Sequence, residues 1–67
     1  MVTLIINGKP RALEGPTNLM DFLRDNKINT QFVAVAHNRV ILQKKDLAIT
    51  MLNDGDVLEL VQPVGGG

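Results

Sequence analysis

The residues best suited to take part in chemistry stand at the end of the chain, where Val64 is followed by Gly65, Gly66 and Gly67. Glycine has no Cβ, so an extended glycine segment can enter a narrow tunnel in which any side chain would collide with the walls. The carboxylate of Gly67 would then be unhindered. Because a carboxylate is a poor acyl donor, an enzyme would first have to convert it to a mixed anhydride with AMP, which a nucleophile could displace. The alternative is an unreactive end that frays in solution.

Other reactive side chains are few and isolated. His37 stands alone at the end of a predicted strand with no nucleophile nearby in the sequence, so we interpret it as a solvated turn residue. The segment Asp54–Asp56 holds two carboxylates, too few for calcium, and a turn in which the central glycine takes a positive φ explains it better. Lys44 and Lys45 are interpreted as a solvated pair, with contact to an acidic partner surface left open.

The composition restricts the classes of function. The 67 residues (7.3 kDa) include no cysteine and one histidine, so the chain has no thiol nucleophile and too few ligands for an all-protein zinc site. Seven basic residues balance seven acidic ones, and the aromatic residues are two Phe, which argues against a nucleic-acid partner. The longest apolar run, residues 32–36, is far too short to span a membrane. We therefore expect a cytoplasmic protein with no membrane partner.

The chain begins with the pattern of a β-hairpin. Residues 1–6 alternate in the manner of a strand with one strongly apolar face. Asn7-Gly8 follows, and both residue types tolerate the positive φ that a type I′ turn requires. The return strand, residues 9–13, contains Pro10, which has no N–H to donate to a neighbouring strand. We therefore expect this strand at the edge of a sheet.

A short amphipathic helix is predicted next. Thr17 or Asn18 is a suitable N-cap because its side-chain oxygen can accept a hydrogen bond from the first turn. Leu19, Phe22 and Leu23 follow at the spacing of a single apolar stripe. A helix of only about nine residues is marginal in water by itself, so we expect it to pack on the sheet.

Three later segments, residues 32–36, 40–42 and 57–61, are rich in β-branched and apolar residues and are predicted to be strands. Turns are predicted at residues 37–39 and 53–56, where polar residues and glycine gather. Three apolar residues in the more polar segment between the last two strands are expected to close the bottom of the core: Leu47, Ile49 and Leu52.

The last strand separates its apolar residues by face. Leu58 and Leu60 alternate toward the core, so Val57 and Val61 should point away from it, and Val64 continues toward the end of the chain. A small apolar patch bordered by charge is a common recognition surface. We therefore predict that Val57, Val61 and Val64 bind partner proteins.

The order of elements predicts an α+β fold. A right-handed crossover through the helix can bring a later strand parallel to the first, which gives a β-grasp arrangement: a mixed sheet of about five strands with one main helix packed on one face. We expect a single domain over residues 1–64 and a flexible Gly-Gly-Gly tail over residues 65–67.

These features together resemble the ThiS family, the sulfur carriers of thiamin biosynthesis, over essentially the whole chain. The residues that carry the resemblance are the Asn7-Gly8 turn, the strand Val33–Ala36 followed by Asn38, Leu52 ahead of the turn Asp54–Asp56, the strand Val57–Val61 and the ending Val64–Gly67. Each is a weak signal alone, but their order and spacing in 67 residues are specific.

The resemblance implies a ubiquitin-like protein that is a cosubstrate and not an enzyme. An E1-like (ThiF-like) adenylyltransferase would use ATP to adenylate the carboxylate of Gly67, which would become a thiocarboxylate. The sulfur donor would be a cysteine desulfurase or a rhodanese-type protein, and the sulfur would go to a ThiG-like thiazole synthase. Gly65 and Gly66 would thread into the partner enzymes. The chain itself would bind no cofactor.

Two alternatives remain open from the sequence. The chain could be the small sulfur-carrying subunit of molybdopterin synthase, although such proteins are usually longer and carry an apolar or aromatic segment before Gly-Gly. It could also be a ubiquitin-like binding module without covalent chemistry, in which case removal of Gly66 and Gly67 would leave every interaction intact.

Overall fold

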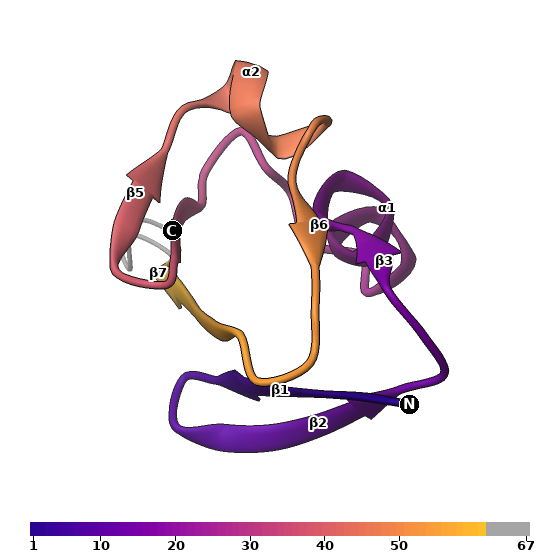
Figure 1. Cartoon of the computed structure of the whole chain (residues 1–67). Coiled ribbons are helices and arrows are strands. Elements are labelled where there is room, and N and C mark those ends of the chain that lie inside the picture. Colours follow the sequence, from indigo (N-terminus) through magenta and orange to yellow (C-terminus); the bar gives the residue numbers. More distant parts are fainter. Residues whose placement is uncertain (62–67) are drawn as a thin grey trace.

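A five-stranded sheet forms the centre of the molecule, with its strands in the order β2-β1-β7-β4-β5 (Figure 1). These strands are β1 (Val2–Ile6), β2 (Lys9–Leu13), β4 (Ala34–His37), β5 (Val40–Leu42) and β7 (Val57–Val61). The computed structural model describes residues 1–61. The predictions for Val64, Gly65, Gly66 and Gly67, and the domain boundary after residue 64, lie outside the described residues.

The hairpin of β1 and β2 forms as the sequence predicts. The two strands are antiparallel, with Ile6 opposite Lys9 at the turn. Asn7 and Gly8 have φ angles of 50° and 83°, the positive values that a type I′ turn requires. β2 lies at the edge of the sheet, as predicted. Pro10 has no N–H to donate, and at the edge of the described sheet no second neighbouring strand needs that hydrogen bond.

β7 lies in the middle of the sheet and joins the two hairpins. It runs parallel to β1, with Ile5 opposite Val57, and antiparallel to β4, with Ala34 opposite Val61. The last described strand therefore lies beside the first, as the crossover through the helix predicts. The mixed five-stranded sheet with one main helix confirms the predicted α+β, β-grasp class.

Helix α1 (Leu19–Asp25) turns its apolar stripe toward the sheet. The predicted N-cap is Asn18, whose side-chain oxygen accepts a hydrogen bond from the N–H of Asp21 at 3.2 Å. The helix ends sooner than the sequence predicts because Lys27 takes a φ of 59°, and its N–H donates to the C=O of Arg24 at 3.0 Å. All three stripe residues are buried: Leu19, Phe22 and Leu23.

The core lies between α1 and the inner face of the sheet. Its buried residues are Val2, Leu4, Leu19, Phe22, Leu23, Val35, Leu47, Leu52 and Leu58. On the inner side of the edge strand, the guanidinium of Arg11 lies 5.5 Å from the centre of the Phe22 ring. At this distance it covers the open side of the ring and contributes a cation–π attraction.

Three short elements are present that the sequence does not predict. β3 (Thr17–Asn18) and β6 (Met51–Leu52) pair antiparallel as a separate two-stranded sheet. The short helix α2 (Lys44–Leu47) begins where the carboxylate of Asp46 accepts a hydrogen bond from the N–H of Gln43 at 3.0 Å. These elements position Leu47 and Leu52 in the core, as expected.

The prediction that Ile49 joins the core is wrong, because its side chain is 78% exposed. The neighbouring Thr50 takes the inward position instead. Its hydroxyl donates to the C=O of Asp46 at 2.6 Å, and its C=O accepts from the N–H of Leu19 at 2.8 Å. These two bonds fix the chain between α2 and β6 and leave Ile49 at the surface.

The predicted strand 32–36 begins later than expected, at Ala34. The N–H of Phe32 donates to the C=O of Asn29 at 3.2 Å, and the N–H of Gln31 donates to the Asn29 side chain at 2.9 Å. Residues 29–32 are therefore held in a turn. Phe32 lies ahead of the strand and is 61% exposed.

Candidate functional site

The face of the sheet opposite α1 carries a set of exposed apolar residues. We call it the outer face and define it by Val57, Glu59 and Val61 of β7, Ala34 and Ala36 of β4, and Ile41 of β5. Val57 and Val61 are 37% and 61% exposed, while Leu58 between them is fully buried. The strand thus separates its residues as the sequence predicts. The partner-binding role of Val57 and Val61 stays a prediction.

Small residues in β4 make this face concave. The strand pairing places Ala34 beside Val61 and places Ala36 between Glu59 and Ile41. Because alanine side chains are short, a shallow hollow of about 230 Å³ forms between Ile41 and Val61. Ile41, at 78% exposed, forms the far rim. Glu59 lies between Val57 and Val61 and beside Ala36, so the apolar residues of this face surround one carboxylate.

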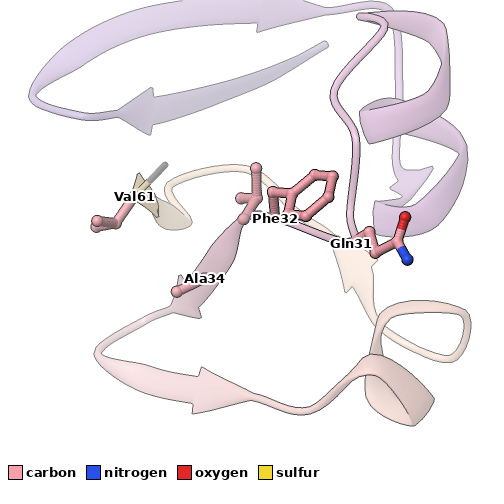
Figure 2. Close-up of a pocket in the computed structure, with 5 residues that line it drawn as sticks. Gln31, Phe32, Ala34 and Val61 are labelled. Carbon is pink, nitrogen blue, oxygen red and sulfur yellow. The ribbon is translucent and has the colours of Figure 1, made fainter. Parts of the chain in front are cut away.

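A second hollow lies where β7 ends, and we call it the Phe32 hollow (Figure 2). Five residues line it: Gln31, Phe32, Val33, Ala34 and Val61. Its volume is about 420 Å³. Figure 2 shows Phe32 and Gln31 on the segment that leads into β4, and Val61 at the end of β7. Two segments far apart in the sequence thus form one apolar surface beside the end of the described chain.

The sequence reasoning missed this hollow because it placed Phe32 inside a strand. The available signal was Asn29, three residues before Phe32, since asparagine often bonds to backbone groups just ahead of it and forms a turn. With a turn at residues 29–32, the aromatic side chain falls outside the strand.

Asn7 holds the end of β7 in place. Its N–H donates to the C=O of Leu58 at 3.0 Å, as a further residue of β1 would. Its side-chain oxygen then accepts from the N–H of Leu60 at 2.9 Å, and its side-chain amide donates to the Leu60 C=O at 3.3 Å. The side chain therefore extends the pairing of β7 after β1 has turned away, directly before Val61. The sequence indicated only the turn.

His37 is not a solvated turn residue, which corrects the sequence-based interpretation. It lies in β4 with a side chain only 19% exposed, and its Nε2 is 2.7 Å from a carboxylate oxygen of Asp56. The turn lies at Asn38 and Arg39, which both have positive φ angles. The Asn38 side chain donates to Asp56 at 3.3 Å and accepts from the N–H of Val57 at 2.8 Å. This network fastens the β4–β5 turn to the start of β7.

The environment of Asp56 favours its ionised form. Burial raises the pKa of this carboxyl, but hydrogen bonds from the N–H of Asn53 and from the side chains of His37 and Asn38, together with the charge of His37, outweigh that effect. The net result is a lowered pKa. Asp56 is therefore held as a carboxylate that joins the end of β4 and the turn after it to the turn Asn53–Asp56.

The turn Asn53–Asp56 has the structural role that the sequence predicts for it. Gly55 has a φ of 87°, and the Asp54 carboxylate accepts a hydrogen bond from the N–H of Thr3 at 2.7 Å.

Within residues 1–61, no three His, Asp or Glu side chains gather as metal ligands would. No helix of that part of the chain has the length and apolar character of a transmembrane span.

The mixed sheet, the single main helix and the apolar face beside the end of β7 define a β-grasp protein of the ubiquitin-like class. The crystal structure of the thiamine biosynthesis protein ThiS from Geobacter metallireducens matches this fold with a TM-score of 0.84 and 30% sequence identity, covering 98% of this chain and 100% of that one. The sequence pattern of the ThiS family matches residues 4–67, and the chain belongs to this family. Its members are small sulfur carriers of thiamin biosynthesis and not enzymes, as the sequence analysis expects.

Two relatives extend the comparison. The sulfur carrier protein ThiS of Thermus thermophilus is 37% identical over 62 residues, which covers 92% of this chain and 95% of that protein. A thiazole synthase of Paramagnetospirillum magneticum is 36% identical over 64 residues, covering 96% of this chain. This chain spans only 20% of the length of that thiazole synthase.

Proposed function

We propose that this chain carries sulfur as a thiocarboxylate on Gly67. The Gly67 carboxylate attacks the α-phosphate of ATP in an E1-like, ThiF-like enzyme, forming an acyl adenylate and releasing pyrophosphate. The terminal sulfur of a persulfide, carried by a cysteine desulfurase or a rhodanese-type protein as the proposed sulfur donor, then displaces AMP and forms an acyl disulfide. A thiol of the partner enzymes cleaves the S–S bond of this acyl disulfide, which leaves the thiocarboxylate on Gly67 and a disulfide on the partner side. ATP and the sulfur donor are used by the partner enzymes.

The observation that carries the proposal is membership of the ThiS family over residues 4–67, a match that includes the glycine ending. The absence of cysteine from the 67 residues supports it, because no thiol is available to hold the sulfur. The carboxylate of Gly67 is the group proposed to hold it. Gly65 and Gly66 would allow it to enter a narrow active site, since they have no side chains.

Thiazole synthase is the proposed acceptor of the sulfur. The relative from Paramagnetospirillum magneticum is named thiazole synthase, and one fifth of it is similar to nearly all of this chain. Joining two parts in one polypeptide raises the effective concentration of each for the other, which is an advantage where one delivers a group to the other. This relationship favours thiazole synthase over molybdopterin synthase as the partner.

The partner enzymes are proposed to dock on the outer face. Val57 and Val61 contribute exposed apolar area there, and Val64 is proposed to continue that contact toward the glycines. Apolar contacts of this kind supply affinity when their centre is shielded from water by the surrounding residues.

The test is to incubate the chain with the ThiF-like enzyme, ATP and a sulfur source and then to measure its intact mass. The expected change is the mass difference between sulfur and oxygen, located in the C-terminal fragment. Deleting Gly67 shortens the reach into the active site by about 3.5 Å, more than a reactive geometry tolerates, so modification should fail. A urea titration serves as the control that the shortened chain is still folded.

Two results would contradict the proposal: modification of the shortened chain, or sulfur on an internal side chain. A chain that binds both partners equally well without Gly66 and Gly67 would instead be a non-covalent module. Transfer of the sulfur to molybdopterin synthase and not to thiazole synthase would favour the other pathway.

A further inference from the structure

We propose that the Phe32 hollow is the docking point by which the activating enzyme distinguishes this chain from other proteins, with an apolar side chain of that enzyme inserted against Phe32 and Val61. This inference rests on the proposed adenylation of Gly67. It adds a site, formed by residues 31–33 ahead of β4 and by Ala34 at its start, to the surface formed by β7.

The length of chain beyond Val61 restricts where the enzyme can lie. Six residues separate Val61 from Gly67, counting Gly67 itself, and a fully extended chain of six residues spans at most about 21 Å. An adenylation site must hold ATP and exclude water, so much of this reach is used inside the enzyme. The enzyme surface must therefore pack close to Val61, which is one wall of the Phe32 hollow.

The chemistry of the substrate requires recognition beyond the reacting group. The activating enzyme receives an ordinary carboxylate, which every protein has at its C-terminus, so the reacting group cannot identify the carrier. Thiazole synthase, in contrast, would receive a thiocarboxylate, which identifies the loaded carrier chemically. Recognition of the folded surface next to the end of the chain therefore contributes most to specificity at the activation step.

The hollow has the properties of an anchor site. Phe32 is one of only two aromatic residues in the chain, and it is 61% exposed, whereas Phe22 is buried in the core. The turn at Asn29 fixes the backbone of residues 31 and 32 through two hydrogen bonds. A rigid, exposed aromatic residue beside a concave apolar surface loses little conformational entropy on binding, which is typical of residues that dominate interface affinity.

The experiment measures ATP–pyrophosphate exchange by the activating enzyme as a function of carrier concentration, with the full-length chain and its Phe32→Ala variant. We expect KM for the carrier to rise at least about tenfold, as for an anchor residue of an interface, with little change in kcat because Gly67 is untouched. Val61→Ala, on the opposite wall, should raise KM as well. Ile49→Ala is the matched control, because Ile49 is an apolar residue even more open to solvent than Phe32, at 78% against 61%, but lines neither hollow.

Each outcome decides between the two proposals. If the wild-type chain supports exchange and Phe32→Ala has the same KM, the proposed docking site is wrong and the proposed function stands. No exchange with the wild-type chain overturns the proposed function and this inference together. A semisynthetic chain with a C-terminal thiocarboxylate tests the other partner, and Phe32→Ala should alter its Kd for thiazole synthase by less than about threefold. A loss of affinity for thiazole synthase alone would also overturn the proposal.

Discussion

Asn7 connects the first turn of the chain to the strand that leads toward its end. Its backbone takes the positive φ that the turn requires, and its side chain bonds to both backbone groups of Leu60. Asparagine suits both roles, since it tolerates this φ and its amide can present an N–H and a C=O side by side, as a peptide group does. The sequence predicted the turn but not the bonds to β7, because nothing in a single sequence pairs residue 7 with residue 60.

The Asn7→Gly variant should separate these roles. Glycine keeps the turn, but both bonds to Leu60 are lost, so the free energy of unfolding should fall by about 1–3 kcal/mol and the N–H of Leu60 should exchange faster with solvent. Hydrogen exchange measured by NMR checks this. Asn7→Asp is the matched control because it keeps the acceptor for the Leu60 N–H. Unchanged exchange at Leu60 in Asn7→Gly would contradict the role assigned to the side chain.

Asp56 should make the stability of the chain depend on pH in the acid range. Because its pKa is lowered in the folded state, the stabilisation is fully present above the ordinary aspartate pKa of about 4 and is lost as the pH falls through the lowered value. Asp56→Asn should therefore be less stable at neutral pH and lose less stability on acidification. Urea titrations at several pH values check this, with Glu14→Gln as a control at an exposed carboxylate. Equal acid sensitivity of Asp56→Asn and the wild type would contradict the prediction.

His37 shows why a lone polar residue is hard to interpret from sequence. Its partner Asp56 is 19 residues away, and the two meet only because β4 pairs with β7. The sequence pattern located both turns near these residues correctly. The hydrogen bonds between the turns depend on strand register, which follows from the folded sheet.

At the scale of elements, the sequence predicts best where periodicity extends over several residues. The apolar stripe of α1, the alternation in β1 and the faces of β7 were all evident and are confirmed. Two of the three missed elements, β3 and β6, consist of two residues each, and the third, α2, has only four, too short to show a period. β3 and β6 pair because Leu52 is buried in the core and Asn18 caps α1, which places Thr17 opposite Leu52 and Asn18 opposite Met51. Both causes are tertiary effects.

Helix α1 should depend on the sheet for its stability. Leu23→Ala removes a fully buried side chain and should lower the free energy of unfolding by about 2–5 kcal/mol, a large fraction of the total for so small a domain. A urea titration followed by circular dichroism checks this. Arg24→Ala, on the exposed side of the same helix, should have a much smaller effect. Similar midpoints for Leu23→Ala and Arg24→Ala would show that the stripe does not stabilise the fold.

At the scale of the whole molecule, the two edges of the sheet differ. β2 carries Lys9, Pro10 and Arg11, residues that discourage another strand from pairing there. β5 has no charged residue, but it is only three residues long. Charge and proline thus protect β2 against pairing with a strand of another molecule, and short length protects β5. The outer face between them remains available for specific contacts.

The parallel pairing of β1 with β7 also determines where a foreign group can be attached. Since Ile5 lies opposite Val57, Met1 and Val61 lie about eight residue steps apart along the strand direction, or about 26 Å. Met1 is 90% exposed, at the side of the sheet away from the end of β7 (Figure 1). A fluorophore or a surface tether on the α-amino group should therefore leave adenylation kinetics unchanged, as exchange assays with tethered and free chains would show. The carrier can thus be immobilised at one end while enzymes act at the other.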